Sequence, residues 1–118
     1  MDIKKPEEFF ERVLPARFDP KKAAGLEAVV QMNIFGHDGG DWVVTVKDQR
    51  MQAKEGVDPS PTIRLRMKDA DFVDLINGKL GAAKAFMTGK LEFSGSISTG
   101  IKLMGIWFGQ EPSAKNEP

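Results

Sequence analysis

The sequence predicts an α+β domain in which five strands form one mostly antiparallel sheet and helices cover one face of it. Three observations lead to this fold class. Between residues 28 and 68 the chain repeatedly alternates apolar and polar side chains, which is the pattern of half-buried strands. Segments with apolar residues at helical spacing flank that region. A sheet with one apolar face must have that face covered, and helices are the available elements.

The length of 118 residues fits one domain. We expect this domain to span residues 1–110, and the polar segment 111–118 to form a flexible tail. Lys plus Arg and Asp plus Glu each number 17, and this balance argues against nucleic-acid binding, which usually requires a basic excess. The chain has no Cys, so disulfides, thiolate catalysis and Cys-based zinc sites are excluded.

The first predicted helix covers residues 6–14. Pro6 suits a first helical turn, and Glu7 and Glu8 favour the positive end of the helix dipole. One face carries the apolar residues Phe9, Phe10, Val13 and Leu14. Pro15 marks the expected end of this helix or a kink in it.

Four strands are predicted next, over residues 28–35, 42–47, 50–54 and 62–68. In the first, even-numbered residues are apolar while Gln31 and Asn33 face the other way. Short connections between the first three predict an antiparallel meander. Each strand is expected to have one apolar face and one solvated face.

The remaining elements are three helices and a fifth strand. A helix is expected to start at Asp69, a good N-cap, and to stop near Gly78. A short helix over 82–87 and a strand over 91–94 follow, and residues 97–108 form the last helix, with Ser96 or Ser98 as its cap.

No residue set forms a strong catalytic or metal-binding motif. The single His37 lies in a Gly- and Asp-rich turn, where solvation explains it better than metal binding. We therefore predict no catalytic residue, no metal and no cofactor. A small enzyme that uses Asp71, Asp74 or Glu92 remains an alternative, and it requires a buried carboxylate with a raised pKa.

The last predicted helix carries more apolar surface than one packing face requires. Ile97, Ile101, Met104 and Phe108 form one stripe, and a second stripe on the far side contains Leu103, Ile106 and Trp107. One stripe must pack on the body, and the other suits a lid, a membrane contact or an oligomer interface. Residues 79–103 also carry four Lys against one acidic residue, Glu92, which could attract an anionic membrane surface.

The segment from Asn77 to Gly95 resembles the sterol carrier protein type 2 family. The matching residues are Gly78-Lys79-Leu80, Lys84-Ala85-Phe86-Met87, Gly89-Lys90-Leu91 and Gly95. The likeness extends over about residues 8–108. One departure is Gln49, which stands in the turn after Asp48 where the family often has Gly.

The resemblance implies a carrier without catalytic activity that binds a fatty acid, acyl-CoA, phospholipid, sterol or other long apolar ligand in a tunnel between sheet and helices. The tunnel wall is then expected to include Val44, Leu65, Phe72, Ile76, Phe86, Met87, Leu91, Phe93, Ile101, Met104 and Phe108.

Two further expectations concern partners and location. A transient contact with a membrane surface fits a carrier, whereas a homodimer or a partner-binding module that uses the last helix is the alternative reading. The chain has no apolar run long enough to span a membrane and no C-terminal Ser-Lys-Leu, so we expect a cytoplasmic protein.

Overall fold

The computed structural model describes the backbone of residues 2–108 and the side chains of residues 2–103. The N-terminal helical segment contains α1 (Pro6–Glu8), η1 (Phe9–Val13) and α2 (Leu14–Arg17). The strands are β1 (Ala28–Phe35), β2 (Gly40–Lys47), β3 (Arg50–Glu55), β4 (Ile63–Lys68) and β5 (Leu91–Gly95). The other helices are α3 (Asp69–Ile76), α4 (Ala82–Met87) and α5 (Ile97–Phe108). The expected tail, residues 111–118, lies outside the described residues.

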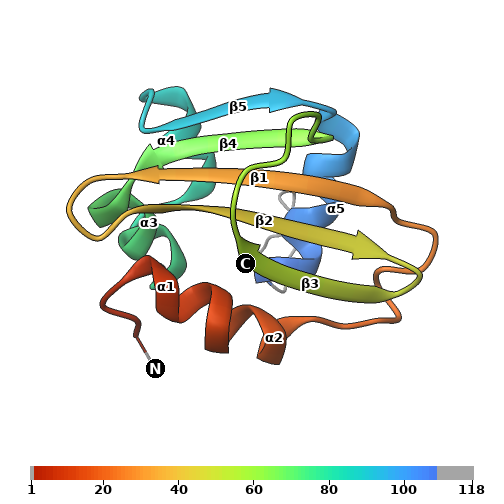
Figure 1. Cartoon of the computed structure of the whole chain (residues 1–118). Helices are drawn as coiled ribbons and strands as arrows, with labels where there is room; N and C mark the ends of the chain where they lie inside the picture. Colours follow the sequence, from red (N-terminus) through yellow and green to blue (C-terminus); the bar gives the residue numbers. More distant parts are fainter. Residues whose placement is uncertain (1, 109–118) are drawn as a thin grey trace, which may run out of the picture.

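The five strands form one sheet in the order β3-β2-β1-β4-β5. Three of its four pairings are antiparallel, and β1 pairs with β4 in parallel. The predicted meander of the first three strands and the mostly antiparallel sheet are both confirmed. Because parallel neighbours need a crossover, the chain between β3 and β4 passes across the sheet (Figure 1).

The helices lie on the face of the sheet opposite this crossover (Figure 1). Helix α3 contacts β4 and β1, helix α4 contacts β5, and η1 contacts β3, while α2 packs on α5. We call the face toward the helices the inner face. This arrangement confirms the α+β fold class, with the helices on one side of the sheet.

The N-terminal helical segment continues past Pro15, so of the two outcomes expected there, an end or a kink, the end is wrong. Helical conformation continues to Arg17. In a regular α-helix the ring of Pro15 would clash with the carbonyl four residues earlier. Residues 9–13 adopt wider π-helical geometry, in which the Leu14 N–H donates to the carbonyl of Phe9. This turn precedes Pro15 and lets the helix continue.

The outer face of the sheet is not fully solvated, which corrects the expectation for Gln31. Its side chain is fully buried beneath the β3–β4 crossover. The Gln31 Nε2 donates to the carbonyls of Trp42 and Gly56 at 3.2 and 3.1 Å, and its Oε1 accepts from the Asp58 N–H at 2.7 Å. Alternation shows which face a residue occupies but not that a distant loop covers it.

Aromatic rings fill the inner face over β1 and β2. Phe9, Phe10 and Phe72 are almost completely buried. The Phe10 ring stacks on Trp42 with centroids 4.6 Å apart and on Phe72 at 5.7 Å, and Phe9 meets both phenylalanines edge-on. Such pairs contribute beyond the area that they bury. This cluster fixes the N-terminal helix and α3 on the sheet.

A polar contact joins the β1–β2 turn to α3. The helix begins at Asp69 as expected, but Lys68 occupies the N-cap position, so the N-cap role of Asp69 is wrong. The Asp69 carboxylate instead accepts from the Asp38 N–H at 2.9 Å, and from Ala70 at 2.8 Å. The hydrogen bond from Asp38 is the main cause that lowers the pKa of Asp69. Gly36 is required here because a Cβ at its positive φ would collide with this carboxylate.

Candidate functional site

Three of the predicted tunnel residues lie within the closed core. Val44 on β2 is fully buried, and Phe72 and Ile76 on α3 are 1% and 6% exposed. All three belong to one cluster of buried apolar residues. They form the base of the space between sheet and helices, next to the aromatic rings.

A second group of predicted residues lies on the inner face of β4 and β5 and is only half-buried, whereas Ile63 and Met67 on the same face of β4 are buried. Leu65 is opposite Phe93, and Met67 is opposite Leu91. Leu65, Leu91 and Phe93 pack on the edge of the core without being closed into it. Helix α5 approaches this surface closely at Gly100, where an added Cβ would lie 2.9 Å from Cε2 of Phe93.

A third group is exposed on the helices that flank β5. Helix α4 is anchored by Ala85, which is fully buried, whereas Phe86 is 58% and Met87 82% exposed. On α5, Ile101 is 47% exposed. The side chains of Met104 and Phe108 lie outside the described residues. The structure thus places the predicted wall residues from the core outward to the surface, and their contact with a ligand stays a prediction.

The orientation of α5 corrects one part of the alternative reading. Leu103 was expected on the stripe left over for a partner, but it is 3% exposed and belongs to the core cluster. Gly100 lies on the same side of the helix, against Phe93. The side chains of Ile97 and Ile101, in contrast, are exposed. Ile106 and Trp107 lie outside the described side chains.

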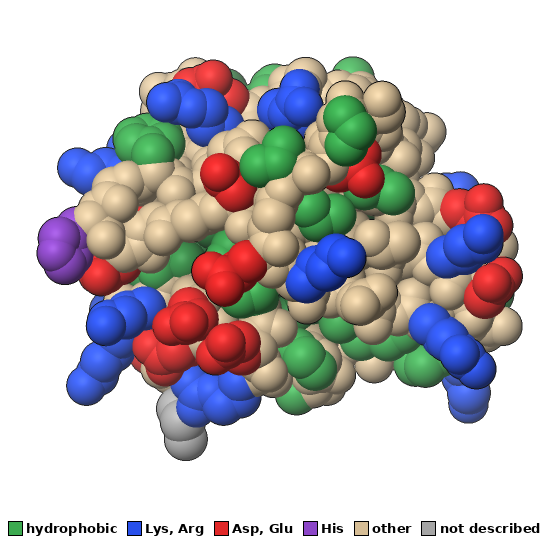
Figure 2. All heavy atoms as spheres, in the orientation of Figure 1, with side chains coloured by type: hydrophobic (Ala, Val, Ile, Leu, Met, Phe, Trp, Pro, Cys, Tyr) green, Lys and Arg blue, Asp and Glu red, His purple; other side chains and the backbone are tan. Residues whose placement is uncertain are grey.

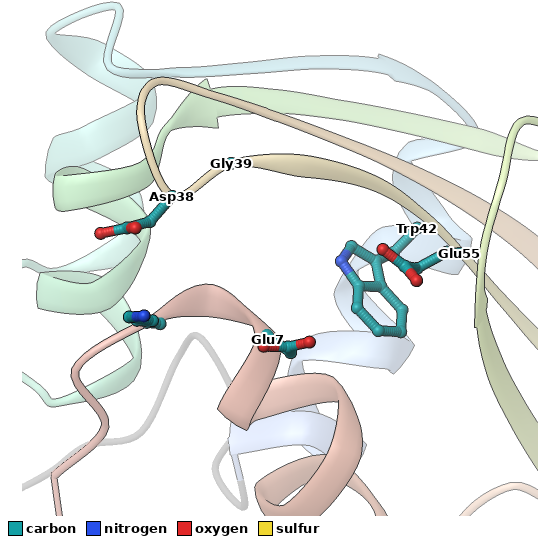
Figure 3. Close-up of a pocket in the computed structure, with 6 residues that line it drawn as sticks. Glu7, Asp38, Gly39, Trp42 and Glu55 are labelled. Atoms are coloured by element: carbon teal, nitrogen blue, oxygen red, sulfur yellow. The ribbon is translucent and has the colours of Figure 1, made fainter.

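Sequence reasoning missed two cavities, which lie beside the N-terminal helix. One has a volume of about 460 Å³, with Phe10, Trp42, Met51 and Ala53 among its lining residues. Its neighbour of about 200 Å³ shares Trp42 and Glu55 with it and extends to the β1–β2 turn (Figure 3). None of the predicted tunnel residues whose side chains the structure describes lines either cavity. The alternation of residues 42–47 puts Trp42 on the same face as Val44, but nothing in that pattern marks a cavity.

Acidic side chains surround these two cavities. Glu7, Glu11, Asp38 and Glu55 line one or both, against a single basic residue, Lys5. Figure 2 shows acidic side chains gathered over α1 and the adjoining edge of the sheet. Within the described residues, Glu7, Glu11 and Glu55 form no ion pair. Asp38 contacts the exposed His37 at 3.2 Å.

The carboxylates of the enzyme alternative are not brought together. Glu92 pairs with Arg66 at 3.0 Å on the outer face of the sheet, whereas Asp71 and Asp74 lie on α3 across the sheet from it. Asp71 is 4.0 Å from the Lys90 ammonium. Among the described residues, no three His, Asp or Glu side chains are placed to hold a metal ion.

The family of the chain follows from its match to a known profile. Residues 9–107 match the SCP-2 sterol transfer family. The chain belongs to that family. The match includes the N-terminal helix, the sheet and nearly all of α5, so it confirms the resemblance seen in the residues from Asn77 to Gly95.

Among curated relatives, hydroxysteroid dehydrogenase-like protein 2 of Rattus norvegicus is 34% identical over 94 residues, covering 78% of this chain and 18% of that protein. The chain thus spans under a fifth of that relative's length. Oleate-induced peroxisomal protein POX18 of Candida maltosa is 30% identical over 93 residues, covering 76% of this chain and 73% of that one.

A solved structure supports the same family. The solution structure of palmitated SCP2L2 from Aedes aegypti has a TM-score of 0.71 and 26% identity, covering 92% of this chain and 98% of that chain. In the part of this chain that the structure describes, no helix is long and apolar enough to cross a membrane.

Proposed function

We propose that this chain is a carrier without catalytic activity that binds a long apolar ligand, such as a fatty acid, acyl-CoA, phospholipid or sterol, against the inner face of β4 and β5. One observation supports this site above others. The inner face is closed over β1 and β2, but Leu65, Leu91 and Phe93 remain half-buried, so this side of the sheet has apolar surface still to bury. The palmitated SCP2L2 of Aedes aegypti, which is similar to this chain, supports the ligand class.

The energetics of the proposed site come from burial alone. A long chain that leaves water gains about 0.8 kcal/mol for each buried CH₂ group, before the costs of association. Phe86 and Met87 on α4 and Ile101 on α5 stand at the two ends of β5 with much of their surface exposed. In this proposal they close over the ligand, and the tunnel forms when it is bound.

The first test is mass spectrometry of an organic extract of the gently purified protein. A stoichiometric fatty acid, phospholipid or isoprenoid is expected. An empty extract, together with no uptake of a fluorescent fatty acid, would contradict the carrier function.

The second test locates the site with two matched variants. Phe86→Asp is expected to abolish uptake of the fluorescent fatty acid, because a carboxylate would replace an apolar wall residue. Phe35→Asp is the control, since Phe35 is 44% exposed but lies on the outer face, where Arg66 stacks on its ring at 4.3 Å. Equal affinity in both variants would exclude α4 from the site.

Transient membrane contact through α4 is part of the same proposal. Phe86 and Met87 are exposed together, with Lys84 before them and Lys90 after them in the chain. Apolar side chains between basic residues suit the surface of an anionic bilayer, where each Lys contributes about 1 kcal/mol. The ligand would then enter and leave the site at the membrane surface, which a cytoplasmic carrier would contact.

Sedimentation with vesicles tests this contact. Wild-type protein is expected to bind phosphatidylserine-containing vesicles more than pure phosphatidylcholine vesicles, and Met87→Glu to reduce that binding. Val57→Glu is the control, because Val57 is 67% exposed on the crossover of the outer face. A matching loss in both variants would place the contact elsewhere.

A homodimer through α5 is the second candidate, because Ile97 and Ile101 are 70% and 47% exposed on one helix. Analytical ultracentrifugation separates the two proposals. A monomer with bound lipid supports the carrier alone, whereas a dimer that Ile97→Asp dissociates would support the interface.

A further inference from the structure

The cavities beside the N-terminal helix form one continuous candidate site, separate from the proposed tunnel. The larger cavity has apolar side chains from η1 and β3, and the smaller one lies between α1 and the β1–β2 turn. Trp42 and Glu55 line both, and the register of β2 and β3 places these two residues opposite each other. A volume of about 460 Å³ in the larger cavity falls in the usual range for small-molecule sites.

The polar group of Trp42 is unsatisfied at this site. Its side chain is 7% exposed, and its ring is fixed by the stack on Phe10. Figure 3 shows the indole nitrogen on the side of the ring that faces the cavity. Among the described residues, none accepts a hydrogen bond from this N–H. Because a buried indole N–H usually has a partner, the site suits an acceptor atom from a ligand.

The charge around the cavities indicates which charge the head group of a ligand should carry. Four carboxylates line them against one ammonium, that of Lys5. The Glu55 carboxylate lies next to the Trp42 ring (Figure 3) and has no ion pair within the described part of the chain. An anionic head group would be repelled here, whereas a cation would gain several partners.

We propose that this site binds a cationic amphiphile of the long-chain amino alcohol class. Its oxygen accepts a hydrogen bond from the Trp42 Nε1–H, its ammonium lies beside Glu55, and its apolar chain covers Phe10, Met51 and Ala53. This ligand differs in charge from a fatty acid, and the site shares no residue with the part of the predicted tunnel wall that the structure describes. The proposal therefore does not rest on the carrier function.

Nuclear magnetic resonance of the Trp42 indole N–H reports on this site directly. The probe is N-dodecylethanolamine, kept below its micelle concentration and added to the full chain labelled with ¹⁵N. The Trp42→Phe variant assigns the Trp42 signal among the two tryptophans of the chain. We expect a saturable shift of this signal with the amino alcohol and none with dodecanoate, which has the same chain length and the opposite charge.

Two variants at exposed carboxylates complete the test. Glu55→Gln is expected to weaken binding of N-dodecylethanolamine roughly fivefold, as for loss of one partly exposed ion pair. Glu27→Gln is the matched control, because this exposed carboxylate precedes β1 at the end far from Trp42 and should leave the affinity unchanged. The proposal is overturned by an unmoved Trp42 signal, by an equal response to dodecanoate, or by a Glu55→Gln variant that binds as wild type does.

Discussion

The two halves of the inner face differ in how completely they are covered. Over β1 and β2, three phenylalanine rings from the N-terminal helix and α3 pack with Trp42 of β2, and the residues of this half are almost all buried. Over β4 and β5, the short helix α4 is held by one buried residue, Ala85, and the strand residues Leu91 and Phe93 remain half-buried.

The difference indicates that one half of the inner face contributes mainly to stability and the other half mainly to ligand binding. Dense packing between the aromatic rings leaves no space for a ligand within this cluster, apart from the cavities at its edge beside Trp42, and it costs several kcal/mol to disturb. Half-covered apolar surface contributes less to stability, yet a ligand can bury it further. We expect variants in the β1–β2 half to affect unfolding first, and variants in the β4–β5 half to affect binding first.

The largest effect is expected from Phe72→Ala. Phe72 is 1% exposed and contacts both Phe9 and Phe10, so the variant should lose about 3–5 kcal/mol of unfolding free energy. Phe93→Ala, in the half-covered region, should lose only about 1–2 kcal/mol. Urea denaturation measures both, and equal losses would show that the two halves are packed alike.

Gln31→Leu tests the cover on the outer face of β1. The variant leaves the Asp58 N–H and the Gly56 carbonyl without their side-chain partner, so we expect a loss of about 2 kcal/mol. Asn33→Leu is the control. Asn33 shares the outer face but makes an exposed hydrogen bond to Asp41, and its loss should stay under about 0.5 kcal/mol. Similar losses would mean that the crossover contributes little.

The β2–β3 turn is expected to give a smaller effect of opposite sign. Asp48 and Gln49 both have positive φ, at 53° and 59°, a conformation that costs most side chains about 1 kcal/mol. Gln49→Gly should therefore gain about 0.5–1 kcal/mol in thermal or urea unfolding. Gln49→Ala keeps the strained backbone but removes the hydrogen bond that the Gln49 side chain donates to the Pro20 carbonyl, so it measures the loss of that bond alone. A loss in Gln49→Gly would mean that this bond outweighs the strain.

The smallest effect concerns pH. The pKa of Asp69 is lowered in the folded state, chiefly by the Asp38 N–H. The stabilisation that ionised Asp69 contributes is therefore complete above the pKa of the unfolded state. It is lost as the pH falls through the pKa of the folded state. Asp69→Asn should flatten the acid side of the stability–pH curve relative to wild type. Parallel curves for wild type and Asp69→Asn would contradict this.

Local signals predicted most of the fold. Alternation of apolar residues located all five strands to within two residues, because side chains of a strand face opposite sides in turn. Of the two outcomes expected at Pro15, the end of the helix is wrong, because a π turn before it lets the helix continue. Of the candidate site, the sequence pattern assigned Leu65 and Phe93 to the inner face, but it could not show that they stay half-buried while Val44 is closed in.

By itself, the sequence determined the order of the elements, the apolar face of each strand and the family resemblance, since these depend on neighbours along the chain. Only the tertiary structure decided which stripe of α5 meets the sheet, because Gly100 and Leu103 fit against Phe93 and the core. It also decided the burial of Gln31 and the cavity at Trp42. Both are formed by segments far apart in sequence, whose approach no local periodicity records.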